Sequence, residues 1–460
     1  MPNSTMKNLE GETGAIDPQW AWEPYVPKGS MPWTSAAAAH LLRRAAFSAT
    51  HLQLEEAVKA GPEKTIDRLL QPQGDVAAFQ ELYDDYEKAS AGSIEALQAW
   101  WLRRLIDTPD PLHEKLTLFW HGHFACSNDS VGSSAIMLDH VRLLRRHALG
   151  SFAEMLDAVA TDPVFLLSRK ADQNRKAIPN LYFAEQFLQL TLGSEACTEH
   201  DSEELARAFT GWFVFQFQTR YIEREHDTGD MTLFGSRGNL DASKAVQLVL
   251  QHPEAARQIV RSMYRLLISE TVEPDDQLIR PLADAFAADY DIRSLVGRML
   301  RSNLFFSPMA YRQKAKSPID YALGIVRPLQ GRLSTETLSR WLTNLGQQLY
   351  YPPTTRGWAG GRDWLNSATF IGRSNLAMVI LSGSKPLACK CDPESLAREN
   401  GCSSTQAAAR FYLELFLQSD IEPETKAKLD KLAADNSGSS RDRLNRVIHA
   451  VLTLPEFHLA

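Results

Sequence analysis

The stretch Ile94-Glu-Ala-Leu-Gln-Ala-Trp-Trp-Leu-Arg-Arg-Leu105 decides the fold class, because its apolar residues recur at the spacing of a helix that buries one face. Pro109 and Pro111 interrupt this run, and a second apolar segment, Leu112 to Trp120, follows them. The same helical spacing returns along most of the chain. The sequence therefore predicts a mainly α protein.

Most of the expected helices are bounded by a glycine, a proline or an acidic residue. Besides the two above, they cover Ala36 to Ala46, Leu52 to Ala60, Ile66 to Leu70, Ser134 to His147, Phe152 to Val159, Phe183 to Thr191, Ser202 to Trp212, Ala242 to Leu250, Ala255 to Ile268, Asp276 to Ala288, Ile292 to Leu300, Pro318 to Pro328, Ser374 to Leu381, Ser403 to Leu417 and a last helix from Leu444. One segment differs, because aromatic and branched residues crowd together in Phe213-Val-Phe-Gln-Phe217 and Tyr221-Ile222. This composition predicts one small β-hairpin between Phe213 and Thr232.

The chain divides at about residue 35. Residues 1–35 are rich in proline and hold Trp20, Trp22 and Trp33, which predicts an irregular N-terminal arm pinned to the body by its tryptophans. Residues 36–460 are expected to form a single large multi-helix domain.

Composition excludes several classes of protein. The 44% hydrophobic and 23% charged residues are typical of a globular protein. The 49 basic and 56 acidic residues give a net charge of -7 without a long basic run, so nucleic-acid binding is not expected. No segment approaches the ~18 consecutive apolar residues of a membrane span. Residues 1–29 contain no apolar signal segment, which predicts a cytoplasmic protein, or a periplasmic one if the native chain starts elsewhere.

Five scattered cysteines favour reduced thiols over a disulfide framework. Cys389, Cys391 and Cys402 are close in sequence, but they lack the paired spacing typical of a zinc site. Cys126 is expected to be a buried, inert thiol, because nothing in the sequence indicates that it is activated.

Two histidines flank a glycine in Lys115-Leu-Thr-Leu-Phe-Trp-His121-Gly122-His123-Phe124. On a continuous helix their side chains would point about 160° apart at ~100° per residue, so they could not bind one ion together. If the helix ended at Gly122, both imidazoles could converge on one ion. The alternative is that one histidine lies in the core and the other faces solvent.

A second polar cluster is Glu225-His226-Asp227-Thr-Gly-Asp230. His226 and Asp227 could complete a metal site begun by His121 or His123, with the nitrogen and oxygen donors that zinc, iron or manganese accept. A plain turn is the alternative, because Asp and Gly occur in turns for backbone reasons. The sequence requires no cofactor, and a divalent transition metal is the one that it leaves open.

Basic residues on neighbouring segments form a third group. Arg43, Lys115 and Arg145 are candidate contacts for an anionic ligand, and a solvated basic face is the alternative. The chain contains no nucleophile elbow, phosphate-binding Walker loop, zinc-protease His-Glu-x-x-His or dinucleotide fingerprint. The local signals of the best-known hydrolase and nucleotide sites are therefore missing.

Several motifs together resemble the bacterial family called domain of unknown function 1800. They are His40-Leu-Leu-Arg43-Arg44-Ala-Ala-Phe47, Lys115 to Phe124, His147-Ala-Leu-Gly150, Ala206-Arg-Ala-Phe-Thr-Gly211-Trp212, His226-Asp227-x-Gly229, Lys316-Ser-Pro318, Gly346 to Gly361 and Pro455-Glu-Phe457. The resemblance implies a single large helical domain and no established activity. It also implies a frequent genetic neighbour, a sulfatase-like protein of the domain of unknown function 1501 family.

The chain departs from the family pattern at charged positions. Where relatives usually show Asn-Glu-Asn-Tyr/Phe-Ala-Arg-Glu, this chain has Asn180-Leu-Tyr-Phe-Ala-Glu185-Gln186. Met231 stands where a lysine usually follows the His-Asp motif. If those polar residues form a shared site in relatives, this chain has altered or lost it.

Two functions from different classes follow. The first is a non-catalytic binding or maturation partner of a sulfatase-like protein, which the family association and the altered Asn180–Gln186 segment favour. The second is a metal-dependent hydrolase, in which His121, His123, His226 and Asp227 hold an ion that activates water.

Overall fold

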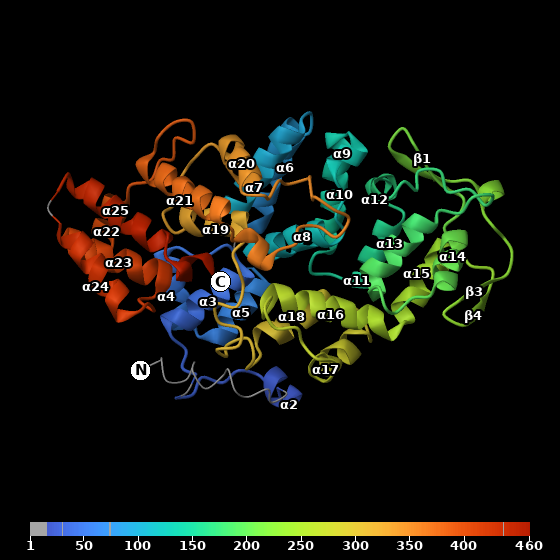
Figure 1. Ribbon diagram of the computed structural model, residues 1–460, viewed down its shortest axis with the longest axis horizontal. Helices are drawn as coiled ribbons and strands as arrows, with labels where there is room; N and C mark the ends of the chain where they lie inside the picture. The colour runs from blue at the N-terminus through green and yellow to red at the C-terminus, as the bar shows by residue number, and fades with distance from the viewer. Residues whose placement is uncertain (1–15, 30, 73–74, 436) are drawn as a thin grey trace.

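A computed structural model of the chain describes residues 16–29, 31–72, 75–435 and 437–460. Helices dominate it, as the sequence predicts (Figure 1). Among the described residues, one extensive hydrophobic cluster runs through the helical body from Ala21 to Phe457, and a small second cluster joins Ala409, Ala433 and Val447.

Two helix pairs form the middle of the molecule. One pair is α7 (Ile94–Asp107) with α20 (Thr335–Asn344), and α6 (Val76–Ser90) packs on α7 as well. The other pair is α8 (Pro111–His123) with α10 (Ser134–His147). The indoles of Trp100, Trp101 and Trp120 are completely buried here, so this region supplies much of the apolar area removed from water.

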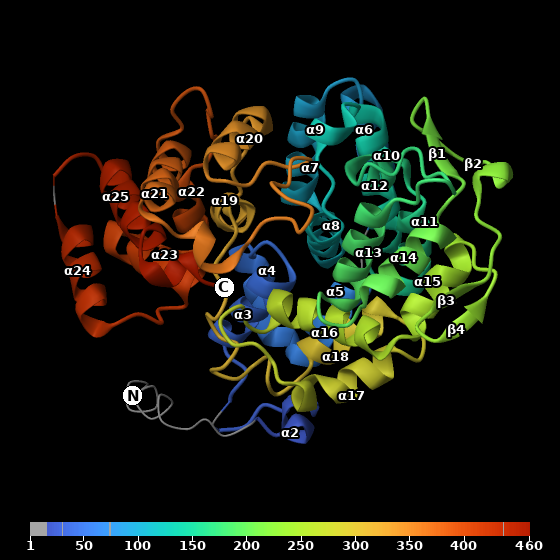
Figure 2. The ribbon, with the colours of Figure 1, turned by 45° about the vertical axis from the view of Figure 1, so that its right-hand side comes forward.

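Both small β-hairpins lie at one end of the molecule, beyond α13 (Leu181–Leu192) and α14 (Glu199–Ala208) (Figures 1 and 2). Strands β1 (Trp212–Phe215) and β2 (Gln218–Tyr221) pair antiparallel, as predicted. A second antiparallel pair, β3 (Met231–Leu233) and β4 (Ser236–Gly238), was not predicted. Its turn uses left-handed backbone at Phe234 and Gly235, with φ of 49° and 79°, and each strand is too short to show alternation.

The predicted helix from Ser202 to Trp212 is too long. Helix α14 ends at Ala208, and Gly211 then adopts a φ of +93°. A side chain at Gly211 would approach the Tyr221 ring to 2.9 Å. Glycine therefore allows the chain to turn sharply into β1, which begins at Trp212.

The C-terminal helices gather at the opposite end (Figure 1). They are α21 (Ser367–Ser382), α22 (Pro393–Glu399), α23 (Thr405–Leu417), α24 (Pro423–Ala434) and α25 (Ser440–Leu452). Helix α25 contacts each of the other four.

The remaining helices connect these regions. They are α3 (Ser35–Ala45), α4 (His51–Ala60), α5 (Pro62–Leu70), α9 (Asn128–Val131), α11 (Phe152–Ala160), α12 (Pro163–Ser168), α15 (Ala242–Gln251), α16 (Pro253–Leu267), α17 (Asp276–Phe286), α18 (Ile292–Leu300) and α19 (Pro318–Val326), with short 3-10 turns η1 (Glu223–Glu225), η2 (Gly361–Trp364) and η3 (Pro455–His458). Among the described helices, none is long and apolar enough to cross a membrane.

The described part of the N-terminal arm is pinned by its tryptophans, as predicted. Trp22 closes the short helix α2 (Pro18–Trp22), and its Nε1 donates to the Leu278 carbonyl at 2.6 Å. Trp33 Nε1 donates to the Val58 carbonyl at 3.1 Å. The predicted division between an arm and one domain at residue 35 stays a prediction.

The last residues return to the middle of the chain. The Lys316 amide donates to the His458 carbonyl at 2.8 Å, and the Ala460 amide donates to the Lys314 carbonyl at 2.8 Å. Residues 458–460 therefore lie beside the segment that leads into α19.

Candidate functional site

A cavity of about 760 Å³ lies where four segments of the chain meet. Helix α8 supplies one wall, and the end of α16 with the residues after it supplies another. The segment entering α19 and the loop 353–364 complete the enclosure. Aromatic side chains and charged groups line it together, the combination expected of a site for a polar ligand.

Lys115 of α8 is fixed from three directions at the wall of this cavity. Its ammonium forms an ion pair with Asp320 of α19 and donates to the Ala46 carbonyl at 3.1 Å. The same ammonium lies 4.8 Å from the centroid of the Phe47 ring. Burial alone would raise the pKa of Asp320, but the nearby ammonium groups of Lys115 and Lys314 hold that pKa below its usual value.

A second ion pair joins Lys314 to Glu270, whose side chains are 13% and 15% exposed. Burial lowers the pKa of Lys314, although the Glu270 carboxylate opposes this effect. Arg44 lies nearby and is 1% exposed, with Nη2 donating to the Ala310 carbonyl at 2.7 Å. Burial lowers the pKa of Arg44 to about 9, and Glu270 again opposes the shift.

Four cations and three carboxylates line the cavity. Three of the cations form ion pairs, namely Lys115 with Asp320, Lys314 with Glu270 and Arg265 with Glu273. The fourth cation, Arg356, is exposed, and its guanidinium forms no ion pair or hydrogen bond with the residues that the structure describes. One positive charge at the rim is therefore available to a ligand.

The loop 353–364 is fastened to the cavity by a close backbone contact. Gly357 has a φ of +79°, and a side chain there would come within 2.2 Å of the Gly122 carbonyl oxygen of α8. Only glycine permits this approach. The Thr355 hydroxyl also donates to Gln186 of α13 at 2.7 Å, so the loop joins two helices.

Helix α8 continues through Gly122 to His123, so the two imidazoles point in different directions. His121 is completely buried against Trp101 and Tyr350, and its Nε2 accepts from the Tyr350 amide at 3.1 Å. His123 lines the cavity. Burial lowers the pKa of His121 to about 3 and that of His123 to about 4, so both are neutral at physiological pH.

His226 and Asp227 do not line this cavity, and they follow the first hairpin in the chain, directly after η1. Nδ1 of His226 lies 2.9 Å from the Thr210 carbonyl oxygen, and Arg207 Nε donates to Asp227 at 2.7 Å. The Arg207 hydrogen bond lowers the pKa of Asp227. In the described part of the chain, no group of three or more His, Cys, Asp or Glu side chains could hold a metal ion. The four residues of the predicted metal site are therefore not brought together as one ligand set.

The altered family motif has three kinds of environment. Asn180 caps α13 by accepting from the Phe183 amide at 2.9 Å. Glu185 is exposed, and Gln186 holds the loop through Thr355. Met231 is completely buried in β3, where a lysine would have to be enclosed among apolar side chains.

Of the predicted anion contacts, only Lys115 lines this cavity. Arg43 donates from Nη1 to Gln418 at 2.8 Å. Arg145 lines a separate cavity of about 770 Å³, where it donates to Glu114 at 3.0 Å. Because Arg104 and Arg142 in that cavity also pair with acidic residues, its positive charge is largely neutralised.

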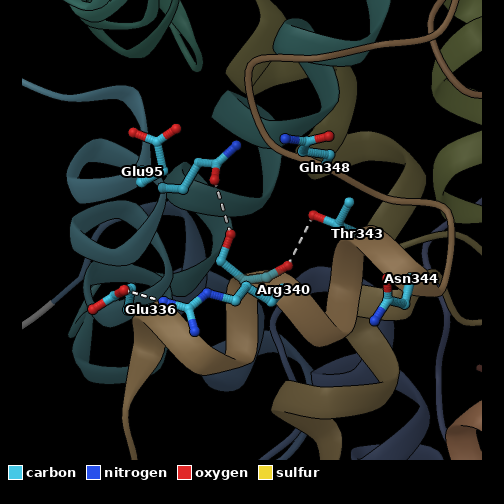
Figure 3. A pocket seen from close by; sticks show the side chains of 8 residues that line it. Glu95, Glu336, Arg340, Thr343, Asn344 and Gln348 are labelled. Atoms are coloured by element: carbon cyan, nitrogen blue, oxygen red, sulfur yellow. Dashed lines mark hydrogen bonds and ion pairs between the residues drawn. The ribbon is translucent and has the colours of Figure 1, made fainter.

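A smaller cleft of about 290 Å³ lies between α7 and α20 (Figure 3). Four of its side chains pair with one another: Arg340 pairs with Glu336, and the Ser339 hydroxyl donates to Gln98 at 3.0 Å. Its one cation is therefore paired, unlike Arg356 in the cavity beside α8.

Sequence reasoning missed Glu270, Lys314 and Arg356. Glu270 follows a helix end with no local motif, and its position is defined only by the folded chain. The sequence does contain a signal for Lys314 and Arg356, because both lie in or next to motifs that carry the family resemblance. Lys314 precedes the motif Lys316-Ser-Pro318, and Arg356 lies within the segment Gly346–Gly361.

Comparison with known proteins yields one match. A family described as "Protein of unknown function (DUF1800)" matches residues 40–459. No curated protein and no solved structure matches the chain.

Proposed function

The chain belongs to the DUF1800 family of proteins of unknown function, and from this premise we propose that it is a non-catalytic binding protein whose cavity beside α8 receives an anionic group. The observation that carries the proposal is the unpaired guanidinium of Arg356 at the rim of a cavity whose other cations are paired. An arginine fork suits a carboxylate, sulfate or phosphate.

The rest of the ligand would face apolar surface. Phe119, Trp358 and Trp364 line the same cavity, and aromatic rings stabilise apolar or ring-shaped parts of ligands by contact area and stacking. The ligand class is therefore an organic anion with an apolar or cyclic portion.

The arrangement also favours binding over catalysis. Both lysines and both of their carboxylate partners are engaged in ion pairs. The neutral imidazole of His123 has one nitrogen, Nε2, buried without a hydrogen-bond partner, so it is poorly placed to exchange a proton with a ligand through that atom.

Calorimetry with small probes tests the proposal. We expect benzoate, phenyl sulfate or phenyl phosphate to bind, and neutral benzamide to bind about tenfold more weakly, because a hydrogen bond to a charged group contributes roughly 1.5–3 kcal/mol. Arg356→Gln should abolish this preference for the anion. Arg362→Gln is the matched control, since Arg362 is also exposed but lies outside the cavity lining. Equal affinity for the charged and neutral probes, or an unchanged Arg356→Gln variant, would contradict the proposal.

The family resemblance suggests who presents the anion. We propose a sulfatase-like protein of the domain of unknown function 1501 family as the partner, with one of its acidic groups seated at Arg356. The purified partner should bind the wild type and the Arg362→Gln variant, and should bind Arg356→Gln more weakly. If the small anions bind but the purified sulfatase-like protein does not, the proposed partner is wrong and the proposed anion site is unaffected.

A further inference from the structure

The first hairpin, β1 with β2, ends in a turn that carries an unusual side chain. Phe215 pairs with Gln218, so Gln216 and Phe217 alone connect the two strands. Both residues have left-handed backbone, with φ of 50° and 64°. Two-residue turns with this backbone favour Asn-Gly, because a bulky side chain at positive φ is strained. The stability of the turn therefore does not explain the phenylalanine at position 217.

The aromatic rings at this turn face solvent. Phe215 and Phe217 are each 45% exposed, and the Phe215 ring lies parallel to the buried Phe213 ring with centroids 5.8 Å apart. The other face of the hairpin is directed to the body of the protein, because the Thr219 hydroxyl donates to the Thr161 carbonyl at 2.9 Å. Side chains alternate along a strand, so Phe215 lies on the outward face. Figure 2 shows this hairpin at the edge of the molecule.

Exposed cations lie behind these two rings. Arg220 of β2 is the pairing partner of Phe213, and the Arg175 guanidinium lies 5.3 Å from the centroid of the same ring. Lys176 and Arg224 are also exposed. The side chains of Lys176, Arg220 and Arg224 form no ion pair or hydrogen bond within the described part of the chain. Their charges are therefore available to an anionic surface.

The hairpin region is positive although the chain as a whole is acidic. Residues 172–178 and 212–225 hold four cations and three carboxylates, whereas the whole chain has a net charge of -7. One of the three carboxylates, Glu225, pairs with Arg175 at 3.5 Å. The local excess of positive charge attracts anions to this end of the molecule.

The exposed rings are too small a surface for a protein partner. A standard protein interface removes about 800 Å² from each partner. Two half-exposed phenylalanines supply roughly 200 Å² together. A lipid surface requires less apolar area, because attraction between basic side chains and anionic headgroups adds to the binding.

The spacing of rings and cations also suits a lipid surface. Arg220 follows Gln218, the pairing partner of Phe215, by two residues, which is about 7 Å along a strand. Apolar side chains at a membrane surface are buried by about 5–10 Å. The Phe215 ring can therefore enter the acyl boundary while Arg220 stays at the depth of the phosphates.

We propose that the first hairpin docks this protein onto an anionic lipid bilayer. Phe215 and Phe217 enter the interface between headgroups and acyl chains, and Lys176, Arg220 and Arg224 contact the headgroup phosphates. The strained backbone at Phe217 is retained because it presents a ring at the end of the hairpin. Binding is peripheral and reversible, since two rings bury little apolar area.

Flotation with lipid vesicles tests the proposal on the full chain. One set of vesicles is equimolar phosphatidylcholine and phosphatidylglycerol, and the other is phosphatidylcholine alone. We expect the wild type to float with the anionic vesicles and far less with the neutral ones. Added salt should release the protein, because it screens attraction between exposed charges.

The variant Phe217→Gly separates lipid contact from folding. Glycine adopts left-handed backbone freely, so the melting temperature should stay the same or rise. Affinity for the anionic vesicles should nevertheless fall by about tenfold, because one inserted ring is lost. Leu82→Ser on α6 is the matched control, since Leu82 is 67% exposed but lies outside the hairpin, and it should bind vesicles like the wild type.

The variant Arg220→Gln tests the charges. It should lower affinity for the anionic vesicles by about fivefold, which is the contribution of one basic side chain near such a surface. Arg68→Gln on the exposed face of α5 is the control and should have no effect. Failure of the wild type to float with the anionic vesicles, or equal flotation of the wild type and Phe217→Gly, would overturn the proposal.

Discussion

Glu114 illustrates how one buried charge organises its surroundings. It is 2% exposed and accepts from Arg104 at 2.5 Å, from Arg145 at 3.0 Å and from Trp101 at 3.3 Å. Burial alone would raise its pKa, but the two arginines lower that pKa to about 2. The carboxylate thereby holds α7, α8 and α10 to one another.

Replacing this carboxylate should be costly. Glu114→Gln leaves two buried guanidinium groups without their counterion, so the free energy of unfolding should fall by about 3–5 kcal/mol. Urea unfolding measures the change. The control is Glu56→Gln on the exposed face of α4, which should alter stability by about 0.5 kcal/mol or less. A loss no larger than that of the control would show that the arginines find other partners.

The histidines make a prediction about metal. Nδ1 of His226 is turned toward Thr210, and Nε2 of His121 accepts from the Tyr350 amide, so one nitrogen of each ring is engaged within the protein. We expect tag-free protein to contain no stoichiometric transition metal by plasma mass spectrometry. The double variant His123→Ala, His226→Ala should give the same content. One metal per chain that disappears in the double variant would instead favour the metal-dependent hydrolase.

At the scale of elements, the contact between the loop and α8 depends on one residue. Gly357→Ala would place a methyl group against the Gly122 carbonyl oxygen, so the loop must move away from the cavity. We expect loss of anion binding by calorimetry and a lower melting temperature. Gly235→Ala is the matched control, because Gly235 has the same φ of +79° but open space around it. Similar behaviour of the two variants would mean that backbone strain, rather than the contact with α8, dominates.

The helices that the sequence predicted best are those whose ends carry their own signals. The range Ser134 to His147 matches α10, and Ile292 to Leu300 matches α18. Several helices were missed, among them α6, whose few buried side chains leave a weak apolar stripe. For the site, Lys115 could be predicted because it stands out in an apolar run. Arg356 could not be predicted as the free cation, since pairing depends on residues distant in sequence.

At the scale of the whole molecule, buried neutral histidines govern the response to acid. Burial lowers the pKa of His121 to about 3, of His123 to about 4 and of His458 to about 3. In the unfolded chain these groups bind protons near pH 6.5. Between these values the unfolded state binds more protons, so stability present above about pH 6.5 is lost as the pH falls.

We therefore expect the free energy of unfolding to decrease from about pH 6.5 to about pH 4, by up to about 1.4 kcal/mol per pH unit for each histidine. Urea unfolding across this window measures the slope. His123→Gln should reduce the slope by one histidine's share, because glutamine does not titrate. His200→Gln is the control, since the His200 side chain is 61% exposed. A curve that stays flat down to pH 4 would show that these histidines gain no protons on unfolding.

The return of residues 458–460 to the segment at Lys314 and Lys316 has a consequence for biosynthesis. A ribosome adds roughly 5–20 residues per second. Residues 458–460 are therefore synthesised many seconds after the segment around Lys314, with which they form backbone hydrogen bonds. Until then the emerging chain exposes an unfinished cavity and depends on protection from aggregation. Once residues 458–460 dock, this wall of the cavity gains the backbone hydrogen bonds that complete it.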